Sequence, residues 1–162
     1  MPRLAKPIDF AQLELTHLAF IVGSLANSQV LDELKRAGFG SVRQSHGYVI
    51  QHLLEGPRAV GELAGLLGVS QQAVSKSVAE LEASGVIESI ASSDARVRRV
   101  QLSTLGERVV SLSRSVRRKL ERRLQRRTNA GDLEAARRVL LTALEELGGT
   151  EAVKQRRVRP TA

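Results

Sequence analysis

Apolar residues recur at spacings of three and four along most of the chain, a pattern that predicts a largely helical protein. The first such stretch runs from residue 8 to about residue 35 and includes Phe10, Leu13, Phe20 and Leu25. It is apolar on more than one side, so we expect a partner chain to cover part of it. Further helices are expected over residues 42–54, 60–67, 71–84, 104–127 and 133–147.

Two runs between these helices, residues 86–91 and 97–102, have the character of short β-strands. The segment SSDAR separates them and predicts a hairpin. A loose arm is expected at residues 1–7, and a basic, disordered tail at residues 150–162.

The segment VGELAGLLGVSQQAVSKSVAELEASGVIE, residues 60–88, predicts two short helices joined by a tight turn. Ala64 is small where the helices must approach each other, and Gly68 can supply the positive φ of the turn. Ser70 can accept a backbone N–H at the start of the second helix. That helix is then expected to bury Val74, Val78 and Leu81. The alternative is a helical hairpin with a structural role alone.

Burial of that stripe leaves short or amide side chains pointing outward from the first turns of the second helix, a composition typical of a helix that lies in the major groove of DNA. Glutamine can pair with adenine, and lysine can bind guanine or a phosphate. The candidate groove-facing residues are Ser70, Gln71, Gln72, Ser75 and Lys76.

The predicted hairpin carries Arg96, Arg98 and Arg99 at and just after its tip. Arginines on a protruding loop fit the minor groove, where narrow A·T-rich stretches concentrate negative potential. We expect Asp94 to pair with an arginine at the base of this loop and to fix its shape. An ordinary exposed turn is the alternative for the hairpin alone.

Composition supports a nucleic-acid partner. The 162 residues have a net charge of +8 and a pI of about 10.9, and only 2% of them are aromatic. A basic chain of this size is expected to meet a polyanion. Few aromatic residues argue against a protein that stacks the bases of single strands. The absence of cysteine excludes disulfides, thiolate metal sites and thiol redox sensing.

The chain resembles the MarR family, the multiple-antibiotic-resistance regulators. The resemblance rests on ELAGLLGVSQQAVSKSVAELEASGVIE, on DARVRR in the hairpin, on LSTLG before the long helix, and on the order of the helices. It implies a homodimer formed by the terminal helices, with a recognition helix in each of two successive major grooves. It also implies Asp94 and Arg96 as the wing pair.

These observations together predict a mainly α (α+β) fold, a winged helix-turn-helix domain with a two-stranded β-wing and a helical dimerisation stem. The expected function is that of a dimeric regulator, a ligand-responsive repressor that binds an inverted repeat in double-stranded DNA. An architectural nucleoid-type protein with weak sequence preference is the alternative. The expected divisions are an arm and dimerisation helix at 1–40, the DNA-binding domain at 41–103, dimerisation helices at 104–149 and the tail at 150–162.

The remaining candidate chemistry is sparse. His17, Phe20 and His46 are the candidate residues of a pocket for a small anionic or aromatic effector at the junction of stem and DNA-binding domain. The basic run 114–127 can neutralise acids of the last helix, extend the field toward DNA, or bind an anion. No motif of an enzyme, cofactor or metal site is recognised. With no signal peptide and no long apolar segment, a cytoplasmic protein is expected.

Overall fold

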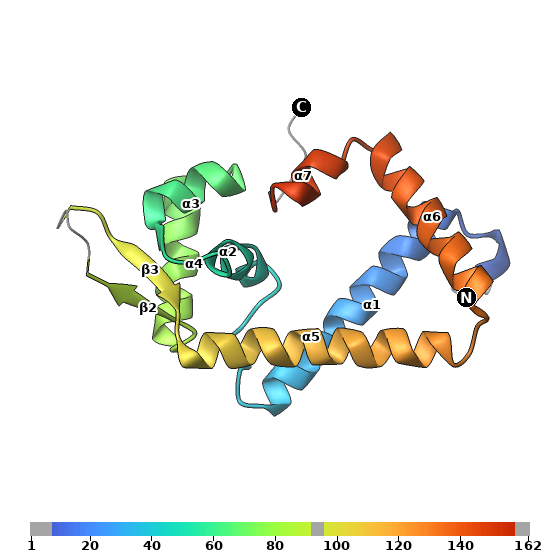
Figure 1. Ribbon diagram of the computed structural model, residues 1–162, viewed down its shortest axis with the longest axis horizontal. Coiled ribbons are helices and arrows are strands. Elements are labelled where there is room, and N and C mark those ends of the chain that lie inside the picture. The colour runs from blue at the N-terminus through green and yellow to red at the C-terminus, as the bar shows by residue number, and fades with distance from the viewer. Residues whose placement is uncertain (1–7, 92–95, 158–162) are drawn as a thin grey trace, which may run out of the picture.

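The computed structural model describes residues 8–91 and 96–157 of the chain. Helices make up most of it (Figure 1). Three short strands form one small sheet. The helical elements are η1 (Phe10–Gln12), α1 (Leu15–Arg36), α2 (His46–Leu53), α3 (Val60–Leu67), α4 (Gln71–Ala83), α5 (Thr104–Gln125), α6 (Ala130–Glu146) and α7 (Thr150–Lys154). The strands are β1 (Arg58–Ala59), β2 (Ile87–Ile90) and β3 (Arg99–Leu102).

The N-terminal helix starts later than its apolar pattern predicts. Asp9 caps the short 3-10 turn η1, accepting from the Ala11 N–H at 3.0 Å, and α1 begins only at Leu15. Helix α6 likewise starts earlier than expected, at Ala130, because the Asn129 side chain caps it.

Two expectations need correction. The sheet has three strands in the order β1-β3-β2, because Arg58 and Ala59 pair antiparallel with Val100 and Arg99. The predicted hairpin supplies the other two strands. The tail expected to be disordered begins instead with a helix, α7, while residues 158–162 lie outside the described part of the chain.

The core lies between α2, α3, α4 and the sheet, where the buried face of α4 packs. Leu63 of α3, Val78 and Leu81 of α4, and Val100 of β3 are fully buried. The turn between α3 and α4 contains Gly68 at φ 66°, a left-handed conformation that favours glycine. The helix-turn-helix predicted from the sequence is therefore confirmed as a fold.

Helix α5 starts directly against the sheet because Gly106 lets it come close. A Cβ at this position would collide with the carbonyl oxygen of Val86, so only glycine fits. Ser103 completes the junction: its hydroxyl accepts from the Gly106 N–H at 3.1 Å and donates to the Gly85 carbonyl at 2.5 Å. The LSTLG segment thus fixes the direction in which α5 leaves the sheet.

A buried polar contact joins α2 to α4. His46 is 1% exposed, its Nδ1 accepts from the Arg43 backbone N–H at 3.2 Å, and its Nε2 lies 2.9 Å from Oε2 of Glu80. Arg43 binds the same carboxylate oxygen at 2.7 Å. The hydrogen bond from His46, reinforced by Arg43, lowers the pKa of the Glu80 carboxyl. Helix α4 is therefore held to α2 by a carboxylate that stays ionised.

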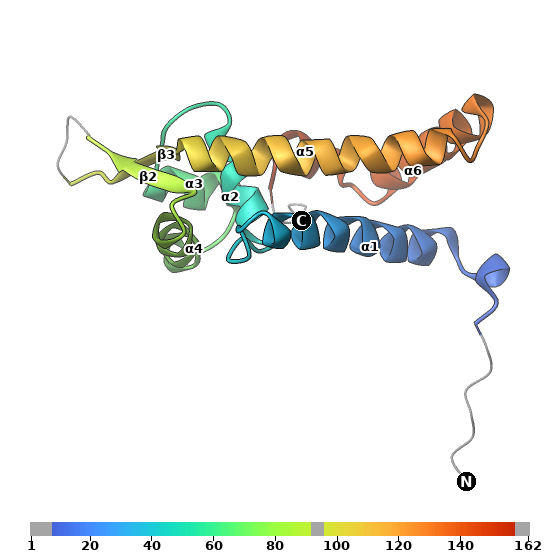
Figure 2. The same ribbon diagram turned by 90° about the horizontal axis from the view of Figure 1, so that it is seen from below.

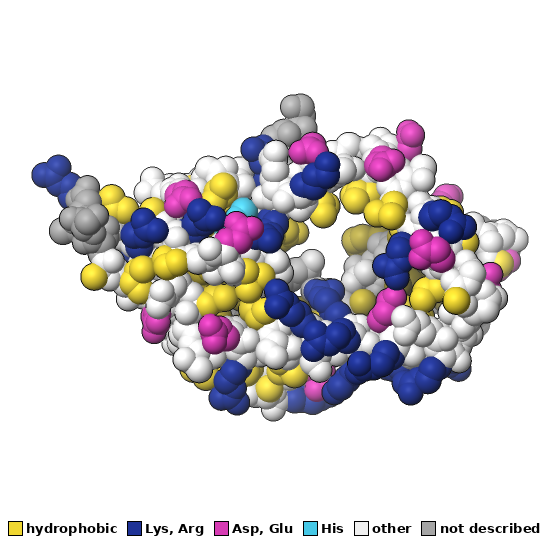
Figure 3. Space-filling model, viewed as in Figure 1, with side chains coloured by type: hydrophobic (Ala, Val, Ile, Leu, Met, Phe, Trp, Pro, Cys, Tyr) yellow, Lys and Arg dark blue, Asp and Glu magenta, His cyan; other side chains and the backbone are white. Residues whose placement is uncertain are grey.

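The other half of the molecule is open. Helix α1 packs along α5, but α6 contributes no buried residue, and the space-filling view has an opening between α5, α6 and α7 (Figure 3). Large apolar side chains are exposed on the stem elements, including Phe10, Leu18, Phe20, Val22, Leu25, Leu124, Val139, Leu140, Leu141 and Leu147. Apolar surface of this extent calls for a covering partner.

We predict that a second copy of the chain covers this surface in a two-fold dimer. Light scattering at micromolar concentration should give about twice the 17.6 kDa chain mass. A monomer under those conditions would contradict the prediction.

We predict that His46→Ala destabilises the fold by about 2–4 kcal/mol, because it removes a buried ring and leaves Glu80 without its buried partner. Denaturant unfolding measures the change. Gln51→Ala, an exposed position on the same helix, is the control and should stay within about 0.5 kcal/mol of the parent. If His46→Ala and Gln51→Ala were equally stable, His46 would make no specific contribution to the stability of the fold.

Candidate nucleic-acid interface

The outward face of α4 consists of small polar and amide side chains. Gln71, Gln72 and Lys76 are exposed and Ser75 is half-buried, and the side chains of all four lack hydrogen-bond partners within the described chain. Ser70 caps the helix, its hydroxyl accepting from the Ala73 N–H at 3.2 Å. The buried positions Val74 and Val78 fix the rotation of the helix and so hold this face toward solvent.

The two acidic side chains of α4 are both bound back to the domain. Glu80 is held by His46 and Arg43, and Glu82 forms an ion pair with Arg98 of the wing. Both carboxylates are thereby neutralised and kept away from the outward face. That face is left neutral at its amides and positive at Lys76, which suits the edges of base pairs flanked by phosphates.

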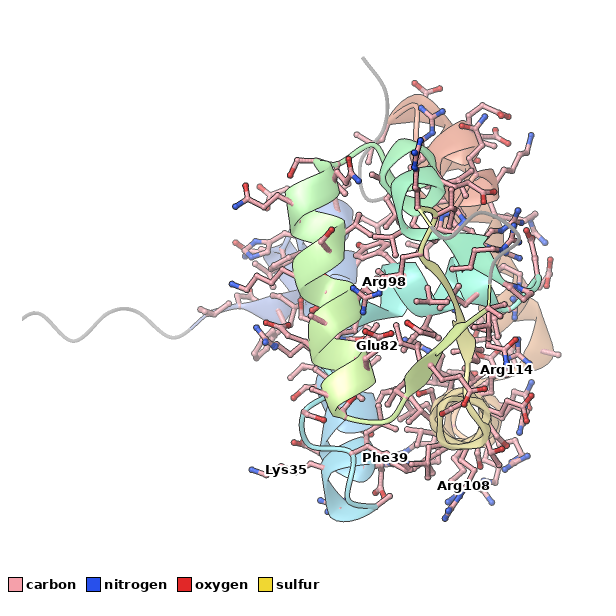
Figure 4. All side chains as sticks on the ribbon, turned by 90° about the vertical axis from the view of Figure 1, so that its left-hand side faces the viewer. Lys35, Phe39, Glu82, Arg98, Arg108 and Arg114 are labelled. Atoms are coloured by element: carbon pink, nitrogen blue, oxygen red, sulfur yellow. The ribbon has the colours of Figure 1, made fainter. Side chains whose placement is uncertain are left out.

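Arg98 connects the wing to α4. In Figure 4 its side chain points from the wing toward the helix, beside Glu82. Ser89 on β2 completes the contact, because its hydroxyl donates to Glu82 Oε1 at 2.5 Å and lies 3.5 Å from Arg98 Nε. The structure thus gives Arg98 a place in setting the angle between the wing and the helix.

The other two wing arginines are placed differently. Arg99 is half-buried and donates to the carbonyl oxygen of Pro57 at 3.1 Å, which ties β3 to the turn after α2. Arg96 is exposed at the distal end of the wing. Asp94, the expected partner of a wing arginine, lies outside the described residues.

The three candidate effector-pocket residues do not come together. His46 is buried between α2 and α4, whereas His17 and Phe20 are exposed near the start of α1. Where α1 reaches the DNA-binding domain, its buried residues are Val30 and Leu34, and His17 lies about 20 Å along the helix axis from the first of these.

Two cavities do lie at the junction. One, of about 180 Å³, is lined by parts of α1, α2 and α5, and contains none of the three candidates in its lining. The other, of about 500 Å³, lies between the end of α2, β3 and α5. Arg114 and Arg118 line the larger one, one helical turn apart, and their side chains form no ion pair within the described chain.

The basic run 114–127 lies along the outer half of α5, and Figure 3 shows Lys and Arg side chains gathered over that helix. Figure 2 shows that α5 and α4 lie on opposite sides of the molecule. Within the run, Glu121 binds Arg137 of α6 at 3.0 Å and Arg117 donates to Asn27 of α1 at 3.5 Å. The remaining arginines of the run face solvent, so their effect at α4 is a long-range field.

Within residues 8–91 and 96–157, no group of three His, Asp or Glu side chains is arranged to hold a metal ion. The same residues include no helix with the length and apolar character needed to cross a membrane.

Sequence reasoning missed the residues that act through partners distant in the chain. Glu82 and Arg98 are sixteen positions apart, and Glu80 and His46 are thirty-four apart. The one available signal is that acids on a helix expected to face DNA need a cation to neutralise them.

Comparison with known proteins agrees with this geometry. The sequence model of the MarR family matches residues 42–97, and a search of curated protein sequences found no match. RV1404 of Mycobacterium tuberculosis has a similar structure, with a TM-score of 0.69 at 21% identity over 88% of this chain and 99% of that one.

Two further solved structures are similar over most of this chain. A variant of S. aureus MepR bound to an oligodeoxyribonucleotide has a TM-score of 0.61 at 17% identity, over 84% of this chain and 99% of that one. Wild-type MarR of E. coli in its apo form also has a TM-score of 0.61, at 18% identity over 82% and 97%. The winged helix-turn-helix segment of this chain therefore matches the MarR family model, and the chain as a whole has a fold similar to that of these solved structures.

Proposed function

We propose that the protein is a dimeric transcriptional regulator, a ligand-responsive repressor that binds an inverted repeat in double-stranded DNA. The observation that carries this proposal is the outward face of α4, where amide, hydroxyl and ammonium groups project while both carboxylates are bound internally. Such a face has the hydrogen-bonding groups needed to distinguish base pairs.

A two-fold dimer would determine which arrangement of DNA sites the outward face of α4 can bind. Two copies of α4 related by the dimer axis would enter major grooves one helical turn apart, so half-site centres are expected about 10 base pairs apart. The wings flank the helices and bring Arg96 toward the minor groove.

The architectural alternative predicts a different surface on α4. A protein that binds phosphates alone would present Lys and Arg there, because those side chains neutralise charge without reading sequence. The first two turns of α4 carry Lys76 as their one cation, and the dense arginines lie on α5 instead.

The effector site that we propose is the 500 Å³ cavity, in place of the site at His17, Phe20 and His46 that the sequence predicts. Arg114 and Arg118 offer two cations for a carboxylate, while Leu53, Leu102 and Val110 offer an apolar wall. A small organic anion with an apolar body fits that lining. Leu102 lies at the end of β3, and the Pro57 carbonyl in the same lining is bound by Arg99 of β3, so occupancy would act on the wing directly.

We predict that selection from a random DNA library yields a palindromic motif, and that Gln72→Ala changes the preferred base at a matched position in both half-sites. Lys76→Ala is the comparison: as a phosphate contact it should weaken all sequences alike and lower the salt slope by about 1. All selections use one stated salt concentration. If no motif emerges and all duplexes bind within a few-fold of one another, the architectural function takes the place of the regulator.

We predict that Arg96→Ala weakens binding to the selected duplex by about 1–3 kcal/mol through loss of a minor-groove contact. Arg98→Ala should also weaken binding, but through the carboxylate of Glu82 that it exposes. The loss caused by Arg98→Ala should therefore shrink when Glu82→Gln is already present, whereas the loss caused by Arg96→Ala should not. Anisotropy titrations of the parent and the five variants measure both couplings, and a full Arg98 effect in the Glu82→Gln background would make Arg98 a direct DNA contact.

A further inference from the structure

The C-terminal end of the described chain returns from the stem to the DNA-binding domain. After α6 the chain turns at Gly148, and α7 returns toward the DNA-binding domain (Figure 1). Arg156, two residues after α7, lies against the end of α2. There Arg156 Nη1 lies 2.6 Å from Glu55 Oε1 and donates to the Gln51 carbonyl at 3.1 Å. The Arg156 carbonyl lies 3.3 Å from His52 Nε2.

This contact has a defined local structure. Arg156 has φ 53°, the single positive φ at a non-glycine residue within the described chain, and the Arg157 N–H closes the turn on the Ala152 carbonyl at 2.8 Å. Ala152 and His52 are both buried beneath it. That burial lowers the pKa of His52, so its neutral ring donates to the Arg156 carbonyl.

The carbonyl that Arg156 binds suits a cation. Gln51 lies in the last turn of α2, where carbonyl groups have no partner within the helix and the helix dipole is negative. Glu55 follows two residues after the helix end and adds a full negative charge. The Arg156 guanidinium therefore neutralises both the negative end of α2 and the carboxylate of Glu55.

Glu55 carries the contact further into the domain. Its second oxygen, Oε2, binds Arg58 at 3.1 Å, and Arg58 also binds Glu62 of α3 at 2.9 Å. Arg58 is part of β1 and pairs with Val100 in β3, the strand that leads out of the wing. The stem's last helix is thereby connected to α2, α3 and the sheet together.

Two covalent crossings otherwise join the stem to the DNA-binding domain, one at residues 37–45 before α2 and one at Ser103 before α5. Near these two crossings, Val30 and Leu34 of α1 and Val109 of α5 also pack into the core of the domain. A third point of contact away from them limits the rotation of the domain on the stem. The α7 contact is such a third point, because α5 and α7 reach the domain from different sides (Figure 1).

We propose that Arg156 is a positioning residue that fixes the tilt of the DNA-binding domain on the stem, and so determines which half-site spacing the dimer accepts. The spacing half of this inference rests on the proposed function as a dimeric regulator. The inference about domain tilt does not depend on that function, because the tilt is measured on the protein without DNA.

The test compares Arg156→Ala with Lys154→Ala. Both remove one positive charge from the C-terminal segment, but the ion pair of Lys154 is with Glu151 inside α7. The protein contains no cysteine, so Gly61→Cys introduces a single site for a spin label. Gly61 is exposed on α3 and a Cβ there meets no atom within 4 Å.

Electron-electron distance measurements on the labelled dimer then report how the two DNA-binding domains are placed. We expect one narrow distribution for the parent and for Lys154→Ala, and a broadened or shifted one for Arg156→Ala, with unchanged helical content and dimer mass. Identical distributions for all three proteins would overturn the proposal.

The second measurement uses the palindrome selected by the parent, with one, two or four base pairs inserted between its half-sites. We expect the parent and Lys154→Ala to lose at least about tenfold in affinity at two inserted pairs, and Arg156→Ala to vary by no more than about threefold over the series. A spacing profile for Arg156→Ala as steep as the parent's would overturn the specificity role. If the library gives no palindrome, the regulator proposal fails, while the distance measurement still decides the tilt.

Discussion

The rotation of α4 about its own axis is the constraint on which the candidate interface depends. Val74, Val78 and Leu81 are almost completely buried, and any turn of the helix about its axis would bring at least one of them into water. Exposing a side chain of this size costs about 1.5–3 kcal/mol, more than the outward-facing polar residues could offset. The direction of Gln72 and Lys76 is therefore determined by the opposite side of the helix.

Polar contacts also fix how α4 is placed against α2 and the wing, which the buried apolar residues alone do not. His46 and Arg43 hold α4 to α2 through Glu80, and Arg98 holds the wing to the far end of α4 through Glu82. These ion pairs therefore hold the elements together and also keep the charges of Glu80 and Glu82 away from the outward face of α4. A helix with these carboxylates unpaired would repel the phosphates that the basic chain attracts.

Local signals made the DNA-binding domain predictable. Gly68, Ser70 and the buried stripe of α4 act within a few residues of one another, so the sequence pattern contains the turn, the cap and the face. Strand β1 could not be predicted, because its two residues become a strand only by pairing with β3. Helix α7 is similar, since Arg156 is held by Glu55 about a hundred positions earlier in the chain.

The candidate site was predictable to the same extent. The outward residues of α4 follow from its periodicity, and their exposure agrees with that expectation. The separate roles of Arg96, Arg98 and Arg99 do not follow from it, because three arginines in one segment look alike until their partners are known. His46 looked like a lining residue for the same reason, and its partner Glu80 places it in the core instead.

The uncovered stem has a consequence for the amount of working protein. Helix α6 has no fully buried residue within its own chain, so in the dimer predicted above part of its share of the folding free energy would come from association with another copy. Folding and assembly would then be one mass-action equilibrium, and the melting temperature would rise with concentration. At low concentration such a dimer would dissociate, and the opened chains would become substrates for proteases. The level of the protein would then fall faster than its synthesis does, which sharpens the response of whatever it controls.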